Sequence, residues 1–449
     1  MPYIQNTPED QKRMLETIGV KSIDDLFEMI PASLRLDRKL NLPPAQTEPE
    51  LTGWMEKIMA ENKPASQTVS FLGGGCYDHF IPAAVDLLAS QGNFVTAYTP
   101  YQAEASQGSL KAFFEFQTLI TQLTGMDVSN ASLYDGVSAC VEAVIMAQTT
   151  GKRRKIIVPD SVHPEILETL GTYLANLSLE LMILPTATGT LEPEQLKRSA
   201  DGETACVLVS HPNFFGNLEQ VEELSGIAHD AGALFIVSVD PISLGVLRRP
   251  DTYHADIVVA EGQALGIPLN FGGPFLGIIA ARESLLRKMP GRIIGQTVDR
   301  RGNRCFTLTM QTREQHIRRE KATSNICSNQ GLMALRATIY LSLVGPRGLR
   351  EVAELSMQKA HYLAEQLAAK TPLKPAFGGK PFFKEFTARA PDSVCLETML
   401  DNLTDQGFFG GIALGKWRKD WKQLLTLAVT EKRTKEEIDR FVDAVSRSI

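Results

Sequence analysis

The sequence predicts an α/β protein built around a mostly parallel sheet that helices cover on both faces. Short apolar runs bounded by polar residues recur through the middle of the chain, and helical patterns lie between several of them. Nearly continuous apolar strands are typical of parallel sheets that are buried on both faces. At 449 residues the chain is long enough for two or three domains, each with its own core.

The first part, residues 1–65, is expected to form a helical arm. Thr7 stands before a proline and two acidic residues, a pattern that predicts a helix ending near Gly19. A second short helix should end at Pro31, because proline cannot continue a helix. A third helix is expected over residues 48–61. Such segments usually brace a larger domain or embrace a partner.

The second part, residues 66–325, is expected to be a large domain that contains the sheet. Residues 219–231 show a helical pattern between two of its strands. The strands are expected at the apolar runs 155–159, 179–184, 205–209, 233–239, 257–260 and 275–280.

The third part, residues 326–449, is expected to be a smaller α/β domain. A long helical stretch follows Gly331, with a Gly-Pro-Arg-Gly interruption that starts at Gly345. Its closing helix is expected over residues 432–449. Strands are predicted at 383–388, 410–414 and 424–429.

Composition excludes several classes of function. The balance of 46 basic and 52 acidic residues offers no general hold on nucleic acid or on a membrane surface. No apolar run approaches the roughly 18 residues of a membrane helix, and the first ten residues have neither the basic start nor the apolar core that a secretion signal needs. The six cysteines show no CxxC spacing, so neither a disulfide framework nor a metal site is expected. These features predict a soluble cytoplasmic protein.

Polar residues follow two of the predicted strands. Asn213 lies in a Pro-Asn turn after one strand, and Asp240 ends the next. Ligands of open α/β sheets bind at the carboxyl ends of the strands. An Asn and an Asp so placed resemble those of the aspartate-aminotransferase-like family of pyridoxal-phosphate enzymes (fold type I), in which the Asp pairs with the pyridinium nitrogen. The alternative is that Asn213 supports a turn and Asp240 only ends a strand.

A glycine-containing turn before a predicted helix, Leu133-Tyr-Asp-Gly-Val-Ser, could hold a phosphate at the helix amides. As a motif it is weak, since many ordinary capped helices begin in the same way.

The lysine that such an enzyme needs is missing. A lysine usually follows the pyridine Asp by a few tens of residues, yet none occurs between Lys197 and Lys288. The neutral Gln263 is the side chain best placed for this position, and it cannot condense with an aldehyde. Lys321 remains a formal candidate, although its charged surroundings favour an exposed face.

Four long motifs resemble those of the glycine cleavage system P-protein family. They are Phe71-Leu-Gly-Gly-Gly-Cys-Tyr-Asp-His, Thr96-Ala-Tyr-Thr-Pro-Tyr-Gln-Ala-Glu-Ala-Ser-Gln-Gly, Asn130-Ala-Ser-Leu-Tyr-Asp-Gly and Arg313-Glu-Gln-His-Ile-Arg-Arg-Glu-Lys-Ala-Thr-Ser-Asn-Ile-Cys-Ser-Asn-Gln. The resemblance runs from the amino terminus to the final helix. In many bacteria this protein is split into two homologous subunits, and the chain is similar to subunit 1, the amino-terminal half.

The resemblance implies a specific reaction and specific partners. The Schiff-base lysine belongs to subunit 2, and Gln263 of this chain, five residues before Pro268, stands at its position. The two subunits, as a pair of heterodimers, would decarboxylate glycine with pyridoxal phosphate held by subunit 2 and release carbon dioxide. The aminomethyl group would pass to the lipoyl arm (lipoamide) of H-protein. This chain would supply walls and dimer contacts and would not carry the cofactor covalently.

Several residues are candidates for a contribution to the shared site. Pro100 stiffens a turn whose phenols, hydroxyl and amide can orient a small carboxylate or a lipoyl arm. The alternative is an interface turn in which the aromatic rings only pack. Two more candidates lie in the last motif, where helix capping explains them equally well. The six are Tyr98, Thr99, Tyr101, Gln102, Ser324 and Asn325.

Other polar residues favour structural roles. Gly73 and the two glycines after it should allow a close approach of the backbone to another surface. His79 is expected to be a buried structural histidine, because its neighbour Asp78 rarely faces the same way as the ring. Cys76 is expected to pack rather than react, and His163 and His211 to be core residues or remnants of a cofactor site.

Two rival functions are open at this point. In one, the chain is a self-sufficient pyridoxal-phosphate lyase or transferase that uses Lys321 or another lysine outside the expected position. In the other, it is a scaffold that contributes no group to an active site.

Overall fold

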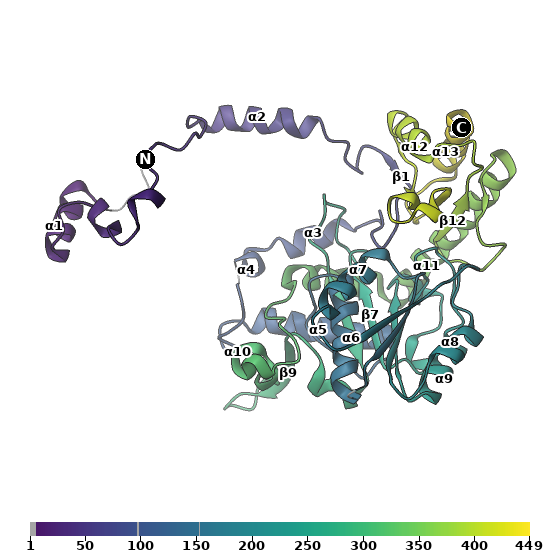
Figure 1. Ribbon diagram of the computed structural model, residues 1–449, viewed down its shortest axis with the longest axis horizontal. Helices are drawn as coiled ribbons and strands as arrows, with labels where there is room; N and C mark the ends of the chain where they lie inside the picture. Colours follow the sequence, from purple (N-terminus) through teal and green to yellow (C-terminus); the bar gives the residue numbers. More distant parts are fainter. Residues whose placement is uncertain (1–5, 97, 152) are drawn as a thin grey trace. The chain divides into compact units, whose positions relative to one another are not determined.

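The computed structural model describes residues 6–96, 98–151 and 153–449 (Figure 1). Its contacts divide the chain into two compact units, residues 1–63 and 64–449. The first residues of the predicted arm, and Ala97 within the second motif, lie outside the described residues. The division of the second unit into a large and a small domain stays a prediction.

The first unit contains the first and third predicted helices, whereas the second is a single-turn 3-10 helix that ends at Phe27, before Pro31. Helix α1 begins after a capping box in which the Thr7 hydroxyl accepts a hydrogen bond from the Asp10 amide, and α2 begins after a similar box at Thr47. Among described residues 6–63 none is buried, and the Trp54 side chain is 51% exposed. The unit therefore has no hydrophobic core of its own. Its elements are α1 (Pro8–Ile18), η1 (Asp24–Phe27), η2 (Ala32–Leu34) and α2 (Glu48–Ala60).

The second unit is built on a sheet of seven strands in the described part of the chain, in the order β2-β8-β7-β6-β5-β3-β4. The five strands from β7 to β4 run parallel, while β8 is antiparallel to both of its neighbours. All six predicted strands are confirmed. The bounds are β2 (Val128–Ser129), β3 (Lys155–Pro159), β4 (Glu180–Leu184), β5 (Thr204–His211), β6 (Leu234–Val239), β7 (Ile257–Glu261) and β8 (Gly277–Ala281).

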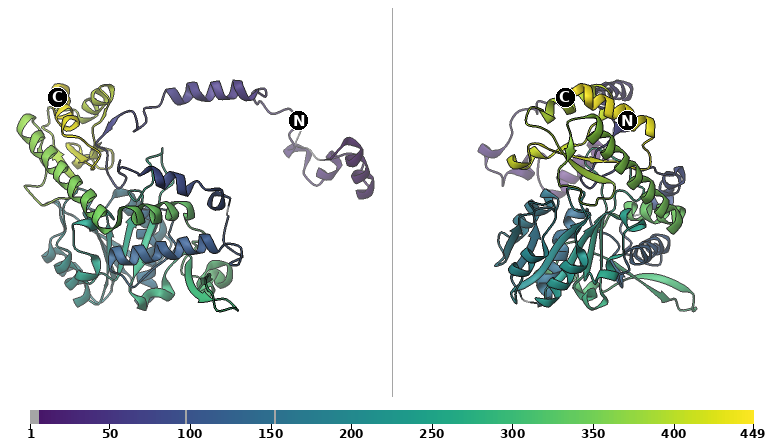
Figure 2. Two further views of the ribbon diagram at one scale, coloured as in Figure 1. Left: turned by 180° about the vertical axis from the view of Figure 1, so that it is seen from behind. Right: turned by 90° about the vertical axis from the view of Figure 1, so that its right-hand side faces the viewer.

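Helices cover both faces of this sheet (Figures 1 and 2). Alternate residues of a strand point to opposite faces. Val207 of β5 therefore packs into one core cluster, with α5 (Gln107–Thr124), α9 and the first half of α11, and Leu208 packs into the other, with α6 and α7. The remaining bounds are α3 (Ala83–Ala89), α4 (Gly92–Val95), α6 (Gly136–Gly151), α7 (Pro164–Leu174), α8 (Pro193–Ser199), α9 (Val221–Asp230) and α10 (Gln315–Arg318).

The carboxyl-terminal part has an antiparallel sheet in the order β11-β12-β15-β14, with a core shared by α11, α12 and α13. Helix α11 is interrupted where the sequence predicts, because Gly345 has a φ of 59° and Pro346 lacks an N–H group. The bounds are α11 (Gly331–Lys370), β11 (Lys374–Pro375), β12 (Glu385–Arg389), α12 (Leu396–Asp405), β14 (Ile412–Ala413), β15 (Leu424–Ala428) and α13 (Lys435–Ser448).

The sequence analysis did not predict two of the strand pairings. Strand β1 (Val69–Ser70) pairs in parallel with β13 (Phe408–Phe409), and β9 (Ile293–Val298) forms a hairpin with β10 (Arg304–Thr309). No helix in the described part of the chain is long and apolar enough to cross a membrane. The single-turn helices are η3 (Ser243–Gly245), η4 (Pro250–Tyr253), η5 (Glu283–Lys288), η6 (Gln311–Arg313), η7 (Arg319–Lys321), η8 (Leu414–Lys416) and η9 (Lys419–Trp421).

Candidate functional site

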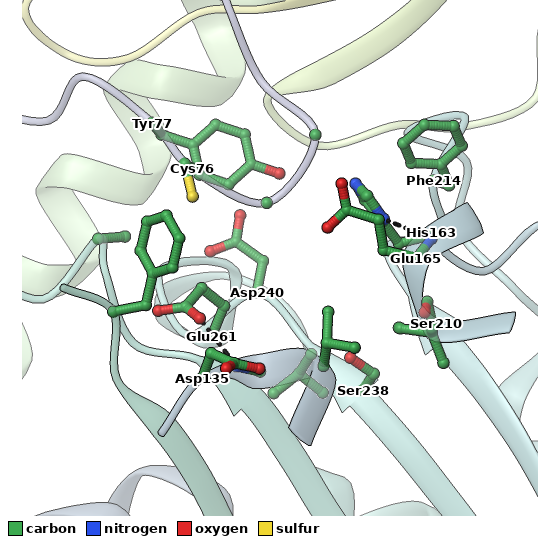
Figure 3. Close-up of a pocket in the computed structure, with 18 of the residues that line it drawn as sticks. Cys76, Tyr77, Asp135, His163, Glu165, Ser210, Phe214, Ser238, Asp240 and Glu261 are labelled. Atoms are coloured by element: carbon green, nitrogen blue, oxygen red, sulfur yellow. Dashed lines mark hydrogen bonds between the residues drawn. The ribbon is translucent and has the colours of Figure 1, made fainter. Parts of the chain in front are cut away.

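A cavity of about 650 Å³ lies at the carboxyl ends of β5, β6 and β7 (Figure 3). Ser210 reaches it from β5, Asp240 from the residue after β6, and Glu261 from the end of β7. This edge of an open α/β sheet is where ligands bind. Both Asn213 and Asp240 line the cavity, as the strand pattern predicts.

The charge of the cavity has one sign. Among the described residues that line it there is neither a lysine nor an arginine, and His163 is the one histidine. The six acidic residues of the lining are Asp135, Glu165, Glu168, Asp240, Glu261 and Glu385.

The first turn of α6 is already bound to carboxyl groups of the chain itself. The Gly136 N–H donates to Glu261 Oε2 at 2.8 Å, and the Ser138 N–H donates to Asp135 Oδ1 at 2.7 Å. The other oxygen of Glu261 accepts the N–H groups of Gln263 and Leu276, at 2.9 and 3.0 Å. Burial raises the pKa of Glu261 to about 7, although the three backbone donors oppose this rise. The residues around the predicted phosphate turn thus form a helix cap.

The Gln263 side chain is 2% exposed and holds the backbone of the segment before α3. Its Oε1 accepts the Tyr77 N–H at 2.8 Å, and its Nε2 donates to the carbonyl groups of Tyr77 and Ile267, at 3.2 and 2.8 Å. The amide is therefore fully engaged in a structural clasp.

Asp240 forms a buried ion pair. Its Oδ2 lies 2.8 Å from Nζ of Lys384, a residue just before β12 whose side chain is 1% exposed. The ammonium group also lies 2.8 Å from His79 Nε2 and 3.6 Å from the centre of the Tyr77 ring. The charge of Lys384 is thus neutralised and its donors are used within the chain.

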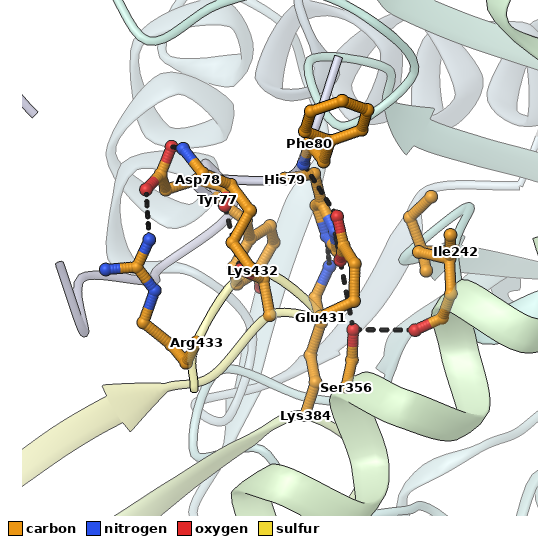
Figure 4. Close-up of polar contacts among 12 residues, drawn as sticks. Tyr77, Asp78, His79, Phe80, Ile242, Ser356, Lys384, Glu431, Lys432 and Arg433 are labelled. Atoms are coloured by element: carbon orange, nitrogen blue, oxygen red, sulfur yellow. Dashed lines mark hydrogen bonds and ion pairs between the residues drawn. The ribbon is translucent and has the colours of Figure 1, made fainter. Parts of the chain in front are cut away.

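His79 connects this pair to a second acid (Figure 4). Its Nδ1 lies 2.6 Å from Glu431 Oε2. Burial and the neighbouring Lys384 lower the pKa of His79. The imidazole is therefore neutral: Nε2 accepts from Lys384, and Nδ1 donates to Glu431. Burial acts to raise the pKa of Glu431, but the hydrogen bonds that it accepts from His79 and from the Phe80 N–H outweigh burial and bring the pKa to about 2.

The expectation of a buried structural His79 is confirmed, since the residue is 6% exposed. Its neighbour Asp78 turns away from the ring. The Asp78 carboxylate instead pairs with Lys432 and Arg433, at 2.6 and 3.1 Å (Figure 4).

The glycine run of the first motif lies against Glu385, as expected for a close approach. A Cβ atom at Gly73 would stand 2.0 Å from Glu385 Oε1, and the Gly74 N–H donates to that oxygen at 2.6 Å. The Tyr77 hydroxyl donates to the other oxygen at 2.8 Å. Burial raises the pKa of Glu385 to about 7.

Cys76, His163 and Asn213 of the cavity wall, and His211 at the end of β5, have structural contacts. Burial, with nearby Glu261, raises the pKa of Cys76 to about 12, which leaves the thiol protonated. Burial lowers the pKa values of His163 and His211 to about 4; His163 Nδ1 caps α7, and His211 Nδ1 accepts from the Glu219 amide. Asn213 holds its own turn, because its Oδ1 accepts the N–H groups of residues 215 and 217.

The turn around Pro100 is open to solvent. Tyr98 is 94% exposed and Tyr101 is 69% exposed, and Gln102 is also exposed. Thr99 Oγ1 lies 3.5 Å from Arg292 Nη2, and the Tyr101 ring centre lies 5.8 Å from the same guanidinium group.

Arg292 lines a groove of about 370 Å³ beside this turn. Tyr98 and Thr99 line one side of it, and residues 328–333, which include the first turn of α11, line the other. Arg292 is 5% exposed, its Nη1 lies 3.4 Å from Asn329 Oδ1, and no ion-pair partner for it is found in residues 6–96, 98–151 and 153–449. A buried guanidinium group beside a helix amino terminus favours an anion.

The last two candidates lie before α11, and the Ser324 side chain also contacts Glu142 of α6. Ser324 Oγ accepts the Ile326 N–H at 3.0 Å, and Asn325 is exposed. Lys321, the candidate of the self-sufficient alternative, is exposed in η7. Within the described residues, no group of three or more His, Cys, Asp or Glu side chains is arranged to hold a metal ion.

Residues 1–445 match the family model of the glycine cleavage system P-protein. The chain belongs to the glycine cleavage system P-protein family. It is 48% identical over 445 residues to the probable glycine dehydrogenase (decarboxylating) subunit 1 of Carboxydothermus hydrogenoformans, with 99% of each chain covered.

Solved structures agree with this assignment. A crystal structure of glycine decarboxylase (P-protein) of the glycine cleavage system, in inhibitor-bound form, matches at a TM-score of 0.90 and 39% identity, with 100% of each chain covered. Lactobacillus brevis glutamate decarboxylase matches at a TM-score of 0.70 and 12% identity, over 93% of this chain and 96% of the other, which shows a common fold. The predicted aspartate-aminotransferase-like fold (fold type I) is confirmed.

Sequence reasoning missed several members of the site. Lys384 and Glu385 fall inside a predicted strand, where two adjacent charges in an apolar run were a signal of a buried ion pair. Arg292 and Glu431 carried no comparable signal, because their partners are far away in the sequence.

Proposed function

We propose that this chain is subunit 1 of a two-subunit glycine decarboxylase and works with a homologous lysine-bearing subunit 2. Glycine would lose its carboxyl group as carbon dioxide, and the aminomethyl group would pass to the lipoyl arm of H-protein. Pyridoxal phosphate, held by the companion subunit, would act as the electron sink for the pair left by decarboxylation. The full-length match to relatives named as subunit 1, and the buried amide of Gln263, support this division of labour.

One observation carries the role of this chain in the shared site. Arg292 is buried in a groove beside exposed Tyr98 and Tyr101, with no acidic partner in the described part of the chain. A charge in such surroundings is costly unless something neutralises it. In the assembled enzyme, this surface would hold an anionic group of the substrate or the cofactor, oriented by Thr99 and Asn329.

The other candidate residues would frame this surface. Tyr98, Tyr101 and Gln102 expose two phenols and an amide beside the groove, and Ser324 and Asn325 precede the segment that lines its far side. These groups can orient a small carboxylate or a lipoyl arm as it enters.

The exposed apolar side chains of the first unit favour contact with a companion chain. Large apolar side chains of residues 6–63, such as Met29 at 86% exposure and Leu34 at 75%, have no core to enter. We expect this arm to pack on the companion subunit in an assembly of two heterodimers, in the cytoplasm.

The test is Arg292→Gln in the purified two-subunit enzyme with H-protein. Loss of a charge-assisted hydrogen bond to an anion should lower kcat/KM for glycine roughly tenfold to a hundredfold. Arg304→Gln is the matched control, because Arg304 also lies over an aromatic ring but is exposed on the β9–β10 hairpin. Size-exclusion chromatography with light scattering checks that both variants assemble. Full turnover by an assembled Arg292→Gln enzyme would make this chain a scaffold.

The self-sufficient alternative has its own test. Borohydride treatment of the single chain with pyridoxal phosphate should fix no cofactor at a defined lysine, and a visible chromophore should appear only after subunit 2 is added. One stoichiometrically modified lysine, at Lys321 or elsewhere, would show that this chain is an enzyme by itself.

A further inference from the structure

The cavity at the strand ends has the place and size of a cofactor site, so its fit to pyridoxal phosphate can be examined group by group. The cofactor has an anionic phosphate at one end and a pyridine nitrogen, protonated beside an aspartate, at the other. A site for it needs free helix amides or cationic side chains at the first end and an unpaired aspartate at the second.

The phosphate end does not fit. The N–H groups of Gly136 and Ser138 in the first turn of α6 already donate to Glu261 and Asp135. The Glu261 carboxyl group is held by two further backbone N–H groups, from Gln263 and Leu276. No lysine or arginine is found among the described lining residues to compensate a second anion.

The pyridine end does not fit either. Asp240 is paired with the ammonium group of Lys384 at 2.8 Å, and both side chains are nearly or fully buried. Lys384 is fixed in turn by His79 and by the face of the Tyr77 ring. A pyridinium group could reach Asp240 only by displacing a buried cation that is also held by the segment of Tyr77 and His79.

We propose that Glu261 and Lys384 are built-in replacements for the two charged ends of pyridoxal phosphate, and that they close this pocket to the cofactor. The chain keeps the strand-end architecture of a cofactor enzyme and neutralises both ends of the pocket with its own side chains. Loss of the lysine at position 263 is then one of three changes that exclude the cofactor, and restoring that lysine alone does not reopen the site.

The proposal is tested by ligand binding to the full single chain, independently of glycine turnover. Equilibrium dialysis measures binding of inorganic phosphate and of pyridoxal phosphate. All chains in these measurements carry Arg292→Gln, which removes the cation of the groove as a second site for anions. With the cavity unchanged, this chain should bind neither ligand saturably at concentrations up to about 1 mM, which corresponds to about 4 kcal/mol of binding free energy. Saturable one-to-one binding of pyridoxal phosphate by this chain would overturn the proposal without any change in the cavity.

Glu261→Ala is the decisive variant for the phosphate end. The freed N–H groups of Gly136, Gln263 and Leu276 should bind inorganic phosphate at least tenfold more tightly than the chain with Glu261 intact does. Glu165→Ala is the matched control, because it removes an acidic group from the same cavity without touching the first turn of α6. Equal gains in both variants would show that total charge alone excludes anions, and would overturn the role of Glu261. Glu261→Ser replaces the alanine variant if circular dichroism shows that the latter does not fold.

Lys384→Met, added to the Glu261→Ala variant, tests the pyridine end of the pocket independently of the phosphate end. Release of Asp240 should tighten binding of pyridoxal phosphate further and leave the affinity for inorganic phosphate unchanged, since inorganic phosphate has no pyridine nitrogen to offer. An equal change for both ligands would refute the assignment of Lys384.

The lysine completes the test. Gln263→Lys alone should give no visible chromophore with pyridoxal phosphate, whereas Gln263→Lys combined with Glu261→Ala should give one that borohydride fixes at residue 263. A stoichiometric chromophore in the single variant would show that the missing lysine alone excludes the cofactor, and would overturn the proposal.

Discussion

The cavity at the strand ends and the groove beside residues 98–102 treat charge in opposite ways. In the cavity, Lys384 is paired with Asp240, and Glu261 is held by backbone amides. In the groove, Arg292 is equally buried and has no acidic partner among the described residues. A charge that is satisfied internally stabilises the chain, whereas one left unsatisfied favours a ligand or chain from outside. Mutations in the cavity should therefore change the stability of the chain, whereas mutations in the groove should change the activity of the complex.

The largest effect on stability is expected at the ion pair of the cavity. Lys384→Met leaves Asp240 buried without its partner, and breaking a buried pair in this way costs about 3–5 kcal/mol. Urea unfolding of the single chain, followed by tryptophan fluorescence, measures the loss.

The control for this variant is an exposed ion pair. Lys435 pairs with Asp439 on α13 and is 72% exposed, so Lys435→Met should leave the unfolding midpoint unchanged. Equal midpoints for the two variants would mean that the cavity pair contributes no more than a surface contact.

A pH dependence should identify Glu261. Burial raises its pKa from 4.5 to about 7, so the folded state binds a proton that the unfolded state has lost between these values. The stabilisation that this proton provides is complete below pH 4.5 and disappears as the pH rises through 7, by about 3 kcal/mol. Glu261→Gln does not titrate. The stability of the variant relative to wild type should therefore increase between pH 4.5 and pH 7.

The same scan contains its own check. Glu219 and Glu385 also have pKa values raised to about 7 by burial, and they are present in both proteins. Their effects cancel in the difference, which isolates Glu261. A difference that stays constant with pH would show that this carboxyl group titrates at its ordinary value in the folded chain.

Much of the fold was predictable because its signals are local. Each buried strand of the main sheet is a short apolar run, and the break of α11 follows from adjacent Gly345 and Pro346. The pairing of β1 with β13 joins residues more than 300 positions apart, and neither two-residue strand has a periodicity that can be recognised. The β9–β10 hairpin is only partly buried, which weakens the apolar alternation of its strands.

The candidate site was predictable only where its position follows from the sheet. The strand ends place Asp240 correctly, and the absence of a lysine at Gln263 can be read directly from the sequence. The sequence does not predict the ion pair that neutralises Asp240, because Lys384 lies 144 positions later, next to a strand of a different sheet. Side-chain pairing across the fold depends on tertiary contacts that no local pattern records.

A smaller effect on stability is expected from the close packing of the cavity wall. Gly73→Ala would place a Cβ atom 2.0 Å from Glu385 Oε1 and 2.8 Å from the Ala428 Cβ atom, both on the adjoining sheet. Such overpacking costs about 1–3 kcal/mol. Gly171→Ala on α7, where no atom lies within 4 Å of the new Cβ, should instead stabilise the chain by about 0.5–1 kcal/mol. Thermal unfolding of the two variants should shift in opposite directions, and equal shifts would refute the close approach.

The smallest effect on stability is expected in the groove, and this small effect gives the clearest contrast with the cavity. Tyr98 is 94% exposed, so Tyr98→Ala should change the unfolding free energy of the single chain by less than about 0.5 kcal/mol. In the complex with subunit 2 and H-protein the same variant should lower glycine turnover about tenfold, because its ring borders the anion surface around Arg292. Val298→Ala, an exposed apolar residue outside the groove, should change neither quantity. An assembled Tyr98→Ala enzyme with full turnover would remove Tyr98 from the shared site and leave Arg292 as the test of whether the groove takes part in the reaction.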